Sequence, residues 1–243
     1  MKTDLQQKVF QADEWLTKIL AKNVYGLNAG LLKTPAQLKE VMGNLRDPAF
    51  VYAKVPTDDL KLAGWLQETG FRLVDTNVIF EKPVTDAVPQ SGQHQVRHAR
   101  PQDESEIVDL AGRGFQYSRF HLDWQIGSEQ ANAVKAQWAR NFFRGQRGDQ
   151  MVVAFREGKA AGFCQIILEK PDVLTIDLIC TDPGLRRQGI GQDMIVFAQN
   201  KNPGMKTVRA GTQVSNIGSI HLYEKMGFRL TRAHYVFHYH KQK

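Results

Sequence analysis

The sequence has little cysteine and no long apolar run. Cys164 and Cys180 are its only cysteines, which is too few for a disulfide framework, and no zinc-ligand spacing is present. Both lie in apolar stretches, so we expect packed rather than reactive thiols. The longest apolar stretches, such as residues 160–168, are far too short to span a bilayer. Residues 1–20 are amphipathic and charged, without the continuous apolar core of a secretion signal. These absences favour a soluble, cytoplasmic protein with no membrane insertion.

Positive charge exceeds negative charge, and the excess is unevenly distributed. The 243 residues include 32 Lys or Arg and 25 Asp or Glu, a net charge of +7. Residues 1–82 hold 11 basic and 10 acidic side chains, whereas residues 83–243 hold 21 and 15. Such an excess favours a polyanionic partner, such as nucleic acid, an anionic membrane surface or a phosphate-bearing small molecule. Apart from the pair Arg186 and Arg187 the basic residues are scattered, so we expect no nucleic-acid partner.

A polar segment, residues 83–95, divides the chain. It reads PVTDAVPQSGQHQ and shows no apolar periodicity, which is typical of a linker. Residues 96–243 are numerous enough to form their own core, and residues 1–82 form a smaller part. The two parts share one pattern at a constant offset: Gly70, Phe71, Arg72 and Leu73 correspond to Gly227, Phe228, Arg229 and Leu230. In each, a helix ends at a glycine and a strand follows. Two explanations are possible: helix–glycine–strand segments are common in proteins, or the first part is a truncated copy of the second part's fold.

The order of expected elements in the second part predicts a mixed α/β sheet. Hairpins and helical crossovers alternate, and Glu157-Gly158-Lys159 is a hairpin turn signal. Apolar periodicity and turn residues predict strands over 96–100, 151–156, 160–168, 174–180, 207–211 and 228–239, and helices from 101, over 128–143, 190–199 and 216–225.

A glycine-rich loop lies between the strand 174–180 and the helix from 190. It reads Arg186-Arg187-Gln188-Gly189-Ile190-Gly191. Backbone amides at a helix N-terminus have no helical acceptor, and glycine lets a phosphate approach them closely. The loop is neither a Walker loop nor a dinucleotide fingerprint, because the residues that define those patterns are missing. We therefore interpret it as an anion site, with a tight structural turn as the alternative.

This context resembles the GNAT acetyltransferase superfamily. That family's loop pattern is matched by Arg186, Gly189 and Gly191, and its second pattern by the segment from Asn216 through Tyr223 to Gly227-Phe228. The resemblance covers residues 96–243 and implies the GNAT acyl-CoA N-acyltransferase fold, a mixed and mostly antiparallel sheet flanked by helices. It also implies acetyl-CoA as co-substrate, bound by Ile179, Cys180, Thr181, Arg186, Arg187, Gln188, Gly189, Ile190, Gly191, Gln192 and Asn216.

The resemblance also implies a mechanism of direct acetyl transfer to an amine. Tyr223 corresponds to the family's general acid, and a phenol can protonate the departing thiolate. Backbone amides of residues 179–181 can polarise the thioester carbonyl. For the general base, Asp75, Asp177 and His121 are candidates. Asp75 ranks first because it corresponds to an acidic residue in one family of this superfamily.

The loop between the first two helices is where such folds usually build the acceptor pocket. Here an arginine stands among aromatic residues, which suits a phosphate-bearing ligand, although an ordered packing loop is the alternative. The loop is similar to that of the dTDP-fucosamine N-acetyltransferase family of enterobacterial common antigen synthesis, which also carries a truncated N-terminal copy of the fold. This resemblance rests on Ser118-Arg119-Phe120, Trp124, Gln137-Trp138, Arg144-Gly145, Tyr25-Gly26-Leu27-Asn28, Ala53-Lys54 and Gly70-Phe71. It implies a nucleotide-activated amino sugar bound by Ser118, Arg119, Phe120 and His121.

The sequence is compatible with other functions as well. A GNAT enzyme for protein amines or polyamines would favour an acidic acceptor groove, and a sensor would bind acetyl-CoA without turnover. His234, His238 and His240 alternate on the last strand, but no acidic or cysteine partner has the spacing to complete a metal site. We therefore expect no metal. The sequence leaves a homodimer open.

Overall fold

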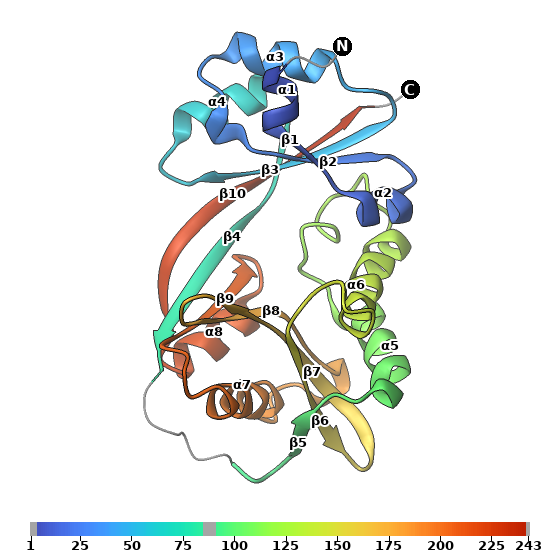
Figure 1. Cartoon of the computed structure of the whole chain (residues 1–243), viewed down its shortest axis with the longest axis vertical. Coiled ribbons are helices and arrows are strands. Elements are labelled where there is room, and N and C mark those ends of the chain that lie inside the picture. Colours follow the sequence, from blue (N-terminus) through green and yellow to red (C-terminus); the bar gives the residue numbers. More distant parts are fainter. Residues whose placement is uncertain (1–3, 85–90, 242–243) are drawn as a thin grey trace.

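One continuous sheet of ten strands organises the molecule (Figure 1). The structure is a computed structural model and describes residues 4–84 and 91–241. The strands are β1 (Phe10–Ala12), β2 (Asn23–Leu27), β3 (Ala49–Pro56), β4 (Arg72–Pro83), β5 (Gln95–His98), β6 (Gln150–Arg156), β7 (Lys159–Glu169), β8 (Val173–Thr181), β9 (Thr207–Gln213) and β10 (Arg229–Lys241). The helices are α1 (Asp4–Val9), α2 (Glu14–Leu20), α3 (Pro35–Gly43), α4 (Leu60–Glu68), α5 (Glu104–Gly114), α6 (Ser128–Phe143), α7 (Ile190–Lys201) and α8 (Ile217–Lys225).

The sheet is mixed and mostly antiparallel, as expected. Its order is β1-β2-β3-β10-β4-β9-β8-β7-β6-β5, and only the pairs β2–β3 and β8–β9 are parallel. Helix α6 covers the predicted residues 128–143, and the β6–β7 hairpin turns at Glu157 and Gly158, whose φ angles of 51° and 77° suit such a turn. Two strands extend beyond their predicted ends, since β9 continues to Gln213 and β10 to Lys241.

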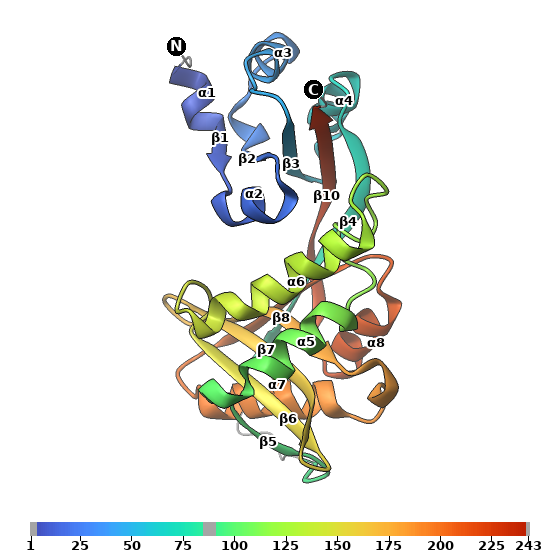
Figure 2. The same cartoon turned by 90° about the vertical axis from the view of Figure 1, so that its right-hand side faces the viewer.

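Helices cover both faces of the sheet beyond β4 (Figure 2). On one face, α5 and α6 pack through Ile107, Leu110 and Ala139 against Met151 and Phe163. On the other face, α7 and α8 form a second core with β4 and with β6 to β10, including Ile190, Met194, Tyr223 and Phe228. Helix α2 packs against α6 across the boundary between the two parts, where the rings of Trp15 and Trp138 meet edge to face with centroids 5.9 Å apart.

The two predicted copies carry the same local structure. In α4 and α8 the N-cap side chains, Asp59 and Asn216, each accept a hydrogen bond from the amide three residues on. Both helices are followed by a glycine in the left-handed region, Gly70 at φ 94° and Gly227 at φ 82°, before the next strand. The parallel pair β2–β3 likewise corresponds to β8–β9.

The last strands of the two copies are exchanged. Strand β10 lies between β3 and β4, and β4 lies between β10 and β9, so each copy's final strand pairs with the strand before the other's final strand. One sheet therefore runs through the predicted parts 1–82 and 96–243, and that division stays a prediction. Strands β4 and β5 take Pro83 and Gln95, the outer residues of the predicted linker, and its residues 85–90 lie outside the described residues.

Candidate functional site

A cleft opens where β8 and β9 separate. The two strands pair only from Val173 to Ile176, after which β8 pairs with β7 alone and β9 continues along β4. The register of β8 against β7 shifts at Asp177, and a bulge of this kind bends the strand. Beyond Ile176 the edge of β8 that faces away from β7 is therefore unpaired. The cleft has a volume of about 860 Å³.

The expected acetyl-CoA residues surround this cleft. Those that line it are Ile179, Cys180, Thr181, Arg186, Arg187, Gly189, Ile190, Gly191, Gln192 and Asn216. Gln188 instead lines an adjoining cavity of about 620 Å³, together with Arg187, Gly189 and Gln192, and it accepts a hydrogen bond from Arg156.

The glycine-rich loop presents free amides, as the sequence predicted. Arg187 and Gly189 adopt φ angles of 64° and 83°, which turn the backbone sharply into α7. The first bond back along this helix runs from Asp193 N to Gly189 O at 3.0 Å. The amides of residues 190–192 therefore have no acceptor within α7, and its dipole adds positive potential there. This arrangement fits the pyrophosphate of acetyl-CoA.

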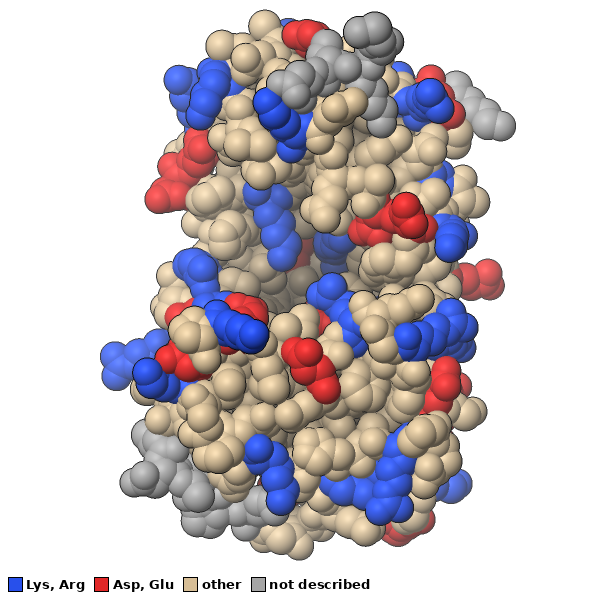
Figure 3. All heavy atoms as spheres, viewed as in Figure 1, with Lys and Arg blue, Asp and Glu red and all other residues tan. Residues whose placement is uncertain are grey.

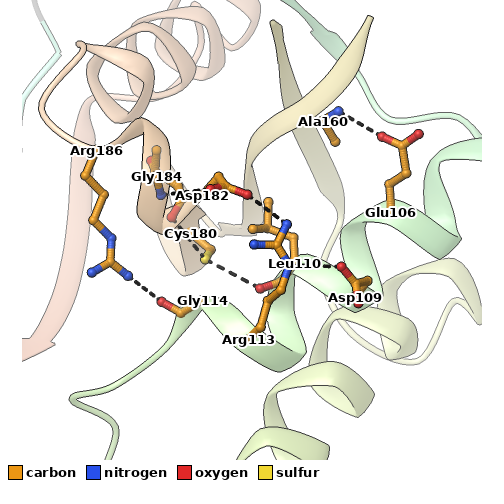
Figure 4. A network of polar contacts seen from close by, with 11 residues as sticks. Glu106, Asp109, Leu110, Arg113, Gly114, Ala160, Cys180, Asp182, Gly184 and Arg186 are labelled. Carbon is orange, nitrogen blue, oxygen red and sulfur yellow. Dashed lines mark hydrogen bonds and ion pairs between the residues drawn. The ribbon is translucent and has the colours of Figure 1, made fainter.

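Side chains fasten the loop to the end of α5 (Figure 4). Arg186 donates to Gly114 O at 2.7 Å, so its guanidinium has a structural contact in addition to its place on the cleft wall. Asp182 accepts from Gly184 N at 2.9 Å and from Arg113 at 2.7 Å. A Cβ on Gly114 would lie 2.2 Å from Cys180 Sγ, so only glycine permits this approach of α5 to β8.

Tyr223 lies at the wall of the cleft from α8. Its side chain is almost fully buried, between the rings of Phe80 and Phe228, yet the residue lines the cavity. Burial raises the pKa of Tyr223, so its phenol keeps the proton throughout the neutral range. A general acid needs this protonation state. Asn216, expected to hold the pantetheine arm, caps α8 by accepting from Ser219 N and also donates to Thr212.

The three candidate bases occupy different surroundings. Asp75 is 8% exposed on β4, and one of its carboxylate oxygens is buried without a hydrogen-bond partner. Burial raises its pKa to about 6. It does not line the cleft, but it shares a cross-strand row with Lys54 and Val236, which do. Asp177 accepts bonds from Arg147, from the Trp138 indole and from Gln165.

The acceptor loop divides into residues at the cleft and residues behind it. Ser118, Arg119 and Phe120 line the cleft, and the Arg119 guanidinium lies over the rings of Tyr52 and Phe120, 4.0 and 4.4 Å from their centroids. His121 is not on the cleft wall. Its two ring nitrogens contact Ser118 Oγ and an oxygen of Asn132. Burial lowers the pKa of His121.

A buried cluster of Asp123, His238 and His240 lies behind Arg119. One carboxylate oxygen of Asp123 contacts His238 Nδ1 and His240 Nε2 at 2.7 Å each. The prediction that no acidic residue meets these histidines is therefore wrong, because the loop before α6 carries Asp123 to β10; His234 is not in this group. The other nitrogen of His238 lies 3.4 Å from an Arg119 nitrogen.

This cluster fixes one protonation pattern. Burial lowers the pKa of His238 to about 4, and the two histidine contacts hold the pKa of Asp123 below its usual range. A neutral His238 that donates from Nδ1 to Asp123 presents the Nε2 lone pair to Arg119. Asp123 and His238 are therefore positioned to orient the guanidinium at the cleft.

The cleft is basic. Figure 3 shows a hollow in the middle of the molecule with lysine and arginine atoms at its rim and in its depth. Among the described residues that line it, Asp177 is the one carboxylate. The sequence reasoning missed five of the cations: Lys54 on β3, Lys135 on α6, and Arg147, Arg209 and Lys225. Lys135 had a signal, because it lies on the apolar face of α6 between Val134 and Trp138.

Both cysteines are packed, as expected. Cys164 and Cys180 are buried, and burial raises the pKa of each thiol to about 12. Cys180 reaches the cleft wall, with Sγ 3.9 Å from Leu110 O. Neither thiol is positioned as a reactive nucleophile, which agrees with direct transfer.

Among residues 4–84 and 91–241, the helices are all too short or too polar to span a bilayer.

Known proteins resemble both the site and the whole chain. Residues 115–228 match the acetyltransferase (GNAT) family. The spore coat polysaccharide biosynthesis protein SpsD of Bacillus subtilis is 26% identical over 95% of this chain and 82% of its own length. An uncharacterized N-acetyltransferase of Methanocaldococcus jannaschii is 33% identical over 56% of this chain and 60% of its own length. A tandem GNAT protein from the clavulanic acid pathway matches with a TM-score of 0.59 and 13% identity, over 89% of this chain and 75% of that one.

The fold, the cleft and these similarities agree. The tandem GNAT structure supports the GNAT fold. Residues 115–228, which carry the glycine-rich loop and Tyr223, are thus the part of the chain that matches the acetyltransferase (GNAT) family, whose members take the acetyl group from acetyl-CoA.

Proposed function

We propose that this enzyme acetylates the amino group of a nucleotide-activated amino sugar, of the dTDP-fucosamine kind. The observation that carries the proposal is one shared cleft. The free amides of the glycine-rich loop, the unpaired edge of β8 and Tyr223 all line it, and so does the loop that carries Arg119. The binding determinants for a diphosphate, a thioester and an acceptor are thus within one cavity. We retain the division into a truncated copy, 1–82, a linker, 83–95, and a catalytic domain, 96–243.

Each part of acetyl-CoA has a complementary surface in the cleft. The amides of Arg187 to Gln192 bind the pyrophosphate, with the side chains of Arg186 and Arg187 adding positive charge. The pantetheine arm lies along residues 179–181, whose free strand edge offers backbone donors and acceptors. Asn216 contacts the arm from the start of α8. Gln188 contributes its backbone amide, as one residue of this loop.

The chain supplies three functions to the chemistry. Backbone N–H groups on the free edge of β8 polarise the thioester carbonyl toward the attacking amine. Tyr223 donates its phenolic proton to the sulfur as the thiolate departs. Asp75 takes up the ammonium proton through water, since it lies in the same cross-strand row as cleft residues but not on the wall. Because Asp177 is fully engaged by Arg147, Trp138 and Gln165, it is the weaker candidate.

Two observations support a sugar nucleotide as acceptor. The relative SpsD, similar over nearly the whole chain, is named for polysaccharide biosynthesis. The acceptor side of the cleft is cationic, and its one described carboxylate is paired with Arg147. A polyamine or a lysine side chain would be repelled there, whereas a diphosphate ester would be attracted.

Release of CoA thiol during turnover tests the proposal. The panel contains dTDP-linked and UDP-linked amino sugars, free amino sugars, spermidine and a lysine peptide. We expect the highest kcat/KM with a nucleotide-linked amino sugar; a preference for spermidine or the peptide would contradict it.

Tyr223→Phe tests the acid. We expect turnover to fall about 10²-fold or more with the KM for acetyl-CoA unchanged, because proton donation acts only in the transition state. Tyr25→Phe, which removes a hydroxyl outside the cleft, is the matched control. Equal turnover of the Tyr223 variant and wild type would remove Tyr223 from the mechanism.

A further inference from the structure

Arg186 and Arg187 of the glycine-rich loop line the cleft, and so does Lys225, which shares the adjoining cavity with that loop. The remaining cations of the cleft fall into two groups. Arg147 forms an ion pair with Asp177, and Arg209 forms ion pairs with Glu81 and Glu169. The second group is different. Within residues 4–84 and 91–241, no carboxylate lies within ion-pair distance of Lys54, Arg119 or Lys135, although all three line the cleft.

The contacts of the second group are neutral. Lys54 donates to the Asn77 side-chain oxygen at 3.2 Å, and Arg119 lies against aromatic rings and His238. Lys135 is 8% exposed, and its ammonium lies 4.7 Å from the ring centroids of both Phe115 and Trp138. Aromatic faces compensate a buried ammonium only in part.

Arg119 also repels both lysines. Desolvation of the ammonium, together with the charge of Arg119, lowers the pKa of Lys54 to about 8 and that of Lys135 to about 8, although Lys54 as a whole residue is exposed and Lys135 is buried. They come from three separate elements: β3, the loop after α5, and α6. A fold that gathers unpaired like charges around one cavity is destabilised by them, unless an anion completes the site.

We propose that Lys54, Arg119 and Lys135 form a second anion site, which binds the diphosphate of a nucleoside diphosphate-linked acceptor. The inference rests on the proposed function and specifies how that acceptor is held. The glycine-rich loop already provides amides and Arg187 for one pyrophosphate, so three further cations on other elements indicate a second anion in the cleft. Three positive charges match a diphosphate ester better than a single carboxylate.

The site has a second consequence for the reaction. A positive potential near the acceptor disfavours the charged form of its amine and so lowers the amine pKa. The neutral amine is the nucleophile. The same residues thus select an anionic acceptor and increase the fraction of its amine that can attack.

Binding of dTDP to CoA-saturated protein tests the site without turnover. Bound CoA occupies the glycine-rich loop, so calorimetry then reports on the second site alone. We expect dTDP to bind, and Lys54→Met and Lys135→Met each to weaken it about tenfold or more, because each removes a charge-assisted contact. Lys159→Met, at the exposed start of β7, is the matched control. Inorganic phosphate and glucuronate are the comparison ligands.

A stability measurement accompanies the binding test. Because Lys135 is an unpaired cation in a buried position, we expect Lys135→Met to raise the Tm of the ligand-free protein while it reduces the stabilisation by dTDP. Unchanged CoA affinity shows that the variants are folded.

Four results would overturn the inference: no dTDP binding in the presence of CoA, binding unaffected by both lysine variants, glucuronate binding as tight as dTDP binding, or inorganic phosphate binding as tight as dTDP binding. Failure of the proposed function is distinguishable. In that case dTDP binds through these lysines but no nucleotide-linked amino sugar is acetylated.

Discussion

Replacing Asp75 by asparagine changes the stability of this protein in a pH-dependent way. Burial raises the pKa of the carboxyl from 3.8 to about 6, whereas asparagine has the same shape and cannot ionise. One pKa unit corresponds to about 1.36 kcal/mol, so ionisation of Asp75 costs the folded state up to about 3 kcal/mol relative to the unfolded chain. For a chain of this length, such a change corresponds to roughly 6–12 °C in Tm.

The sign follows from the direction of the shift. The folded state holds the Asp75 proton more tightly than the unfolded chain, so this group favours folding most below about pH 4. That contribution is lost as the pH rises from about 4 to about 6. We therefore expect the free energy of unfolding of Asp75→Asn, relative to wild type, to rise by up to about 3 kcal/mol across this window.

Urea unfolding of both proteins in the same buffers measures this difference, because every other titrating group cancels. Asp58→Asn, which changes an exposed carboxyl, is the control and should give a flat difference. A flat difference for Asp75→Asn as well would refute the argument that this carboxyl is buried with one oxygen unpartnered. Turnover gives a separate result: if Asp75 is the base, kcat falls about 10²-fold and the acid limb near pH 6 disappears.

Two further predictions concern the supports of the site. Asp123→Asn weakens the fixed pattern at His238 and frees Arg119 to move, so we expect the KM for the acceptor to rise about tenfold while the KM for acetyl-CoA stays unchanged; an unchanged acceptor KM would contradict the positioning role. Gly114→Ala places a Cβ 2.2 Å from Cys180 Sγ, so we expect a loss of about 1–3 kcal/mol in the free energy of unfolding and weaker CoA binding. Gly112→Ala, whose Cβ would be 3.6 Å from Ala136, should be neutral or stabilising, and equal effects of the two would contradict the reasoning.

The local structure of the second part was predictable because its signals are local. Apolar periodicity predicted α6, the dipeptide Glu157-Gly158 predicted a hairpin turn, and the glycine-rich loop predicted free amides at the start of α7. The residues between Ile179 and Gln192 that line the cleft were predictable for the same reason, because they lie in one continuous strand–loop–helix segment. Gly70 and Gly227 similarly marked the repeat.

What the sequence did not predict depends on contacts between distant residues. Asp123 meets His238 over a separation of 115 positions, and no spacing rule connects a loop residue with a strand that far away. Lys54 reaches the cleft only because β10 lies beside β3, so its position depends on the strand exchange. His121 stood among cleft residues in sequence, yet its hydrogen bonds to Ser118 and Asn132 place it behind the wall.

The exchanged strands have a consequence for how the chain folds. Strand β3 has β2 on one side, but its other neighbour is β10, about 180–190 positions later in the chain. Both neighbours of β4 in the sheet, β9 and β10, also come much later in the chain. Contacts of such separation carry a large loop-closure entropy and form late, so the first 80 or so residues emerge from the ribosome with strand edges that nothing nearby covers. We therefore infer that β10 pairs with β3 and β4 in a slow, late folding step that completes both copies at once. Until that step the nascent first copy is exposed to aggregation.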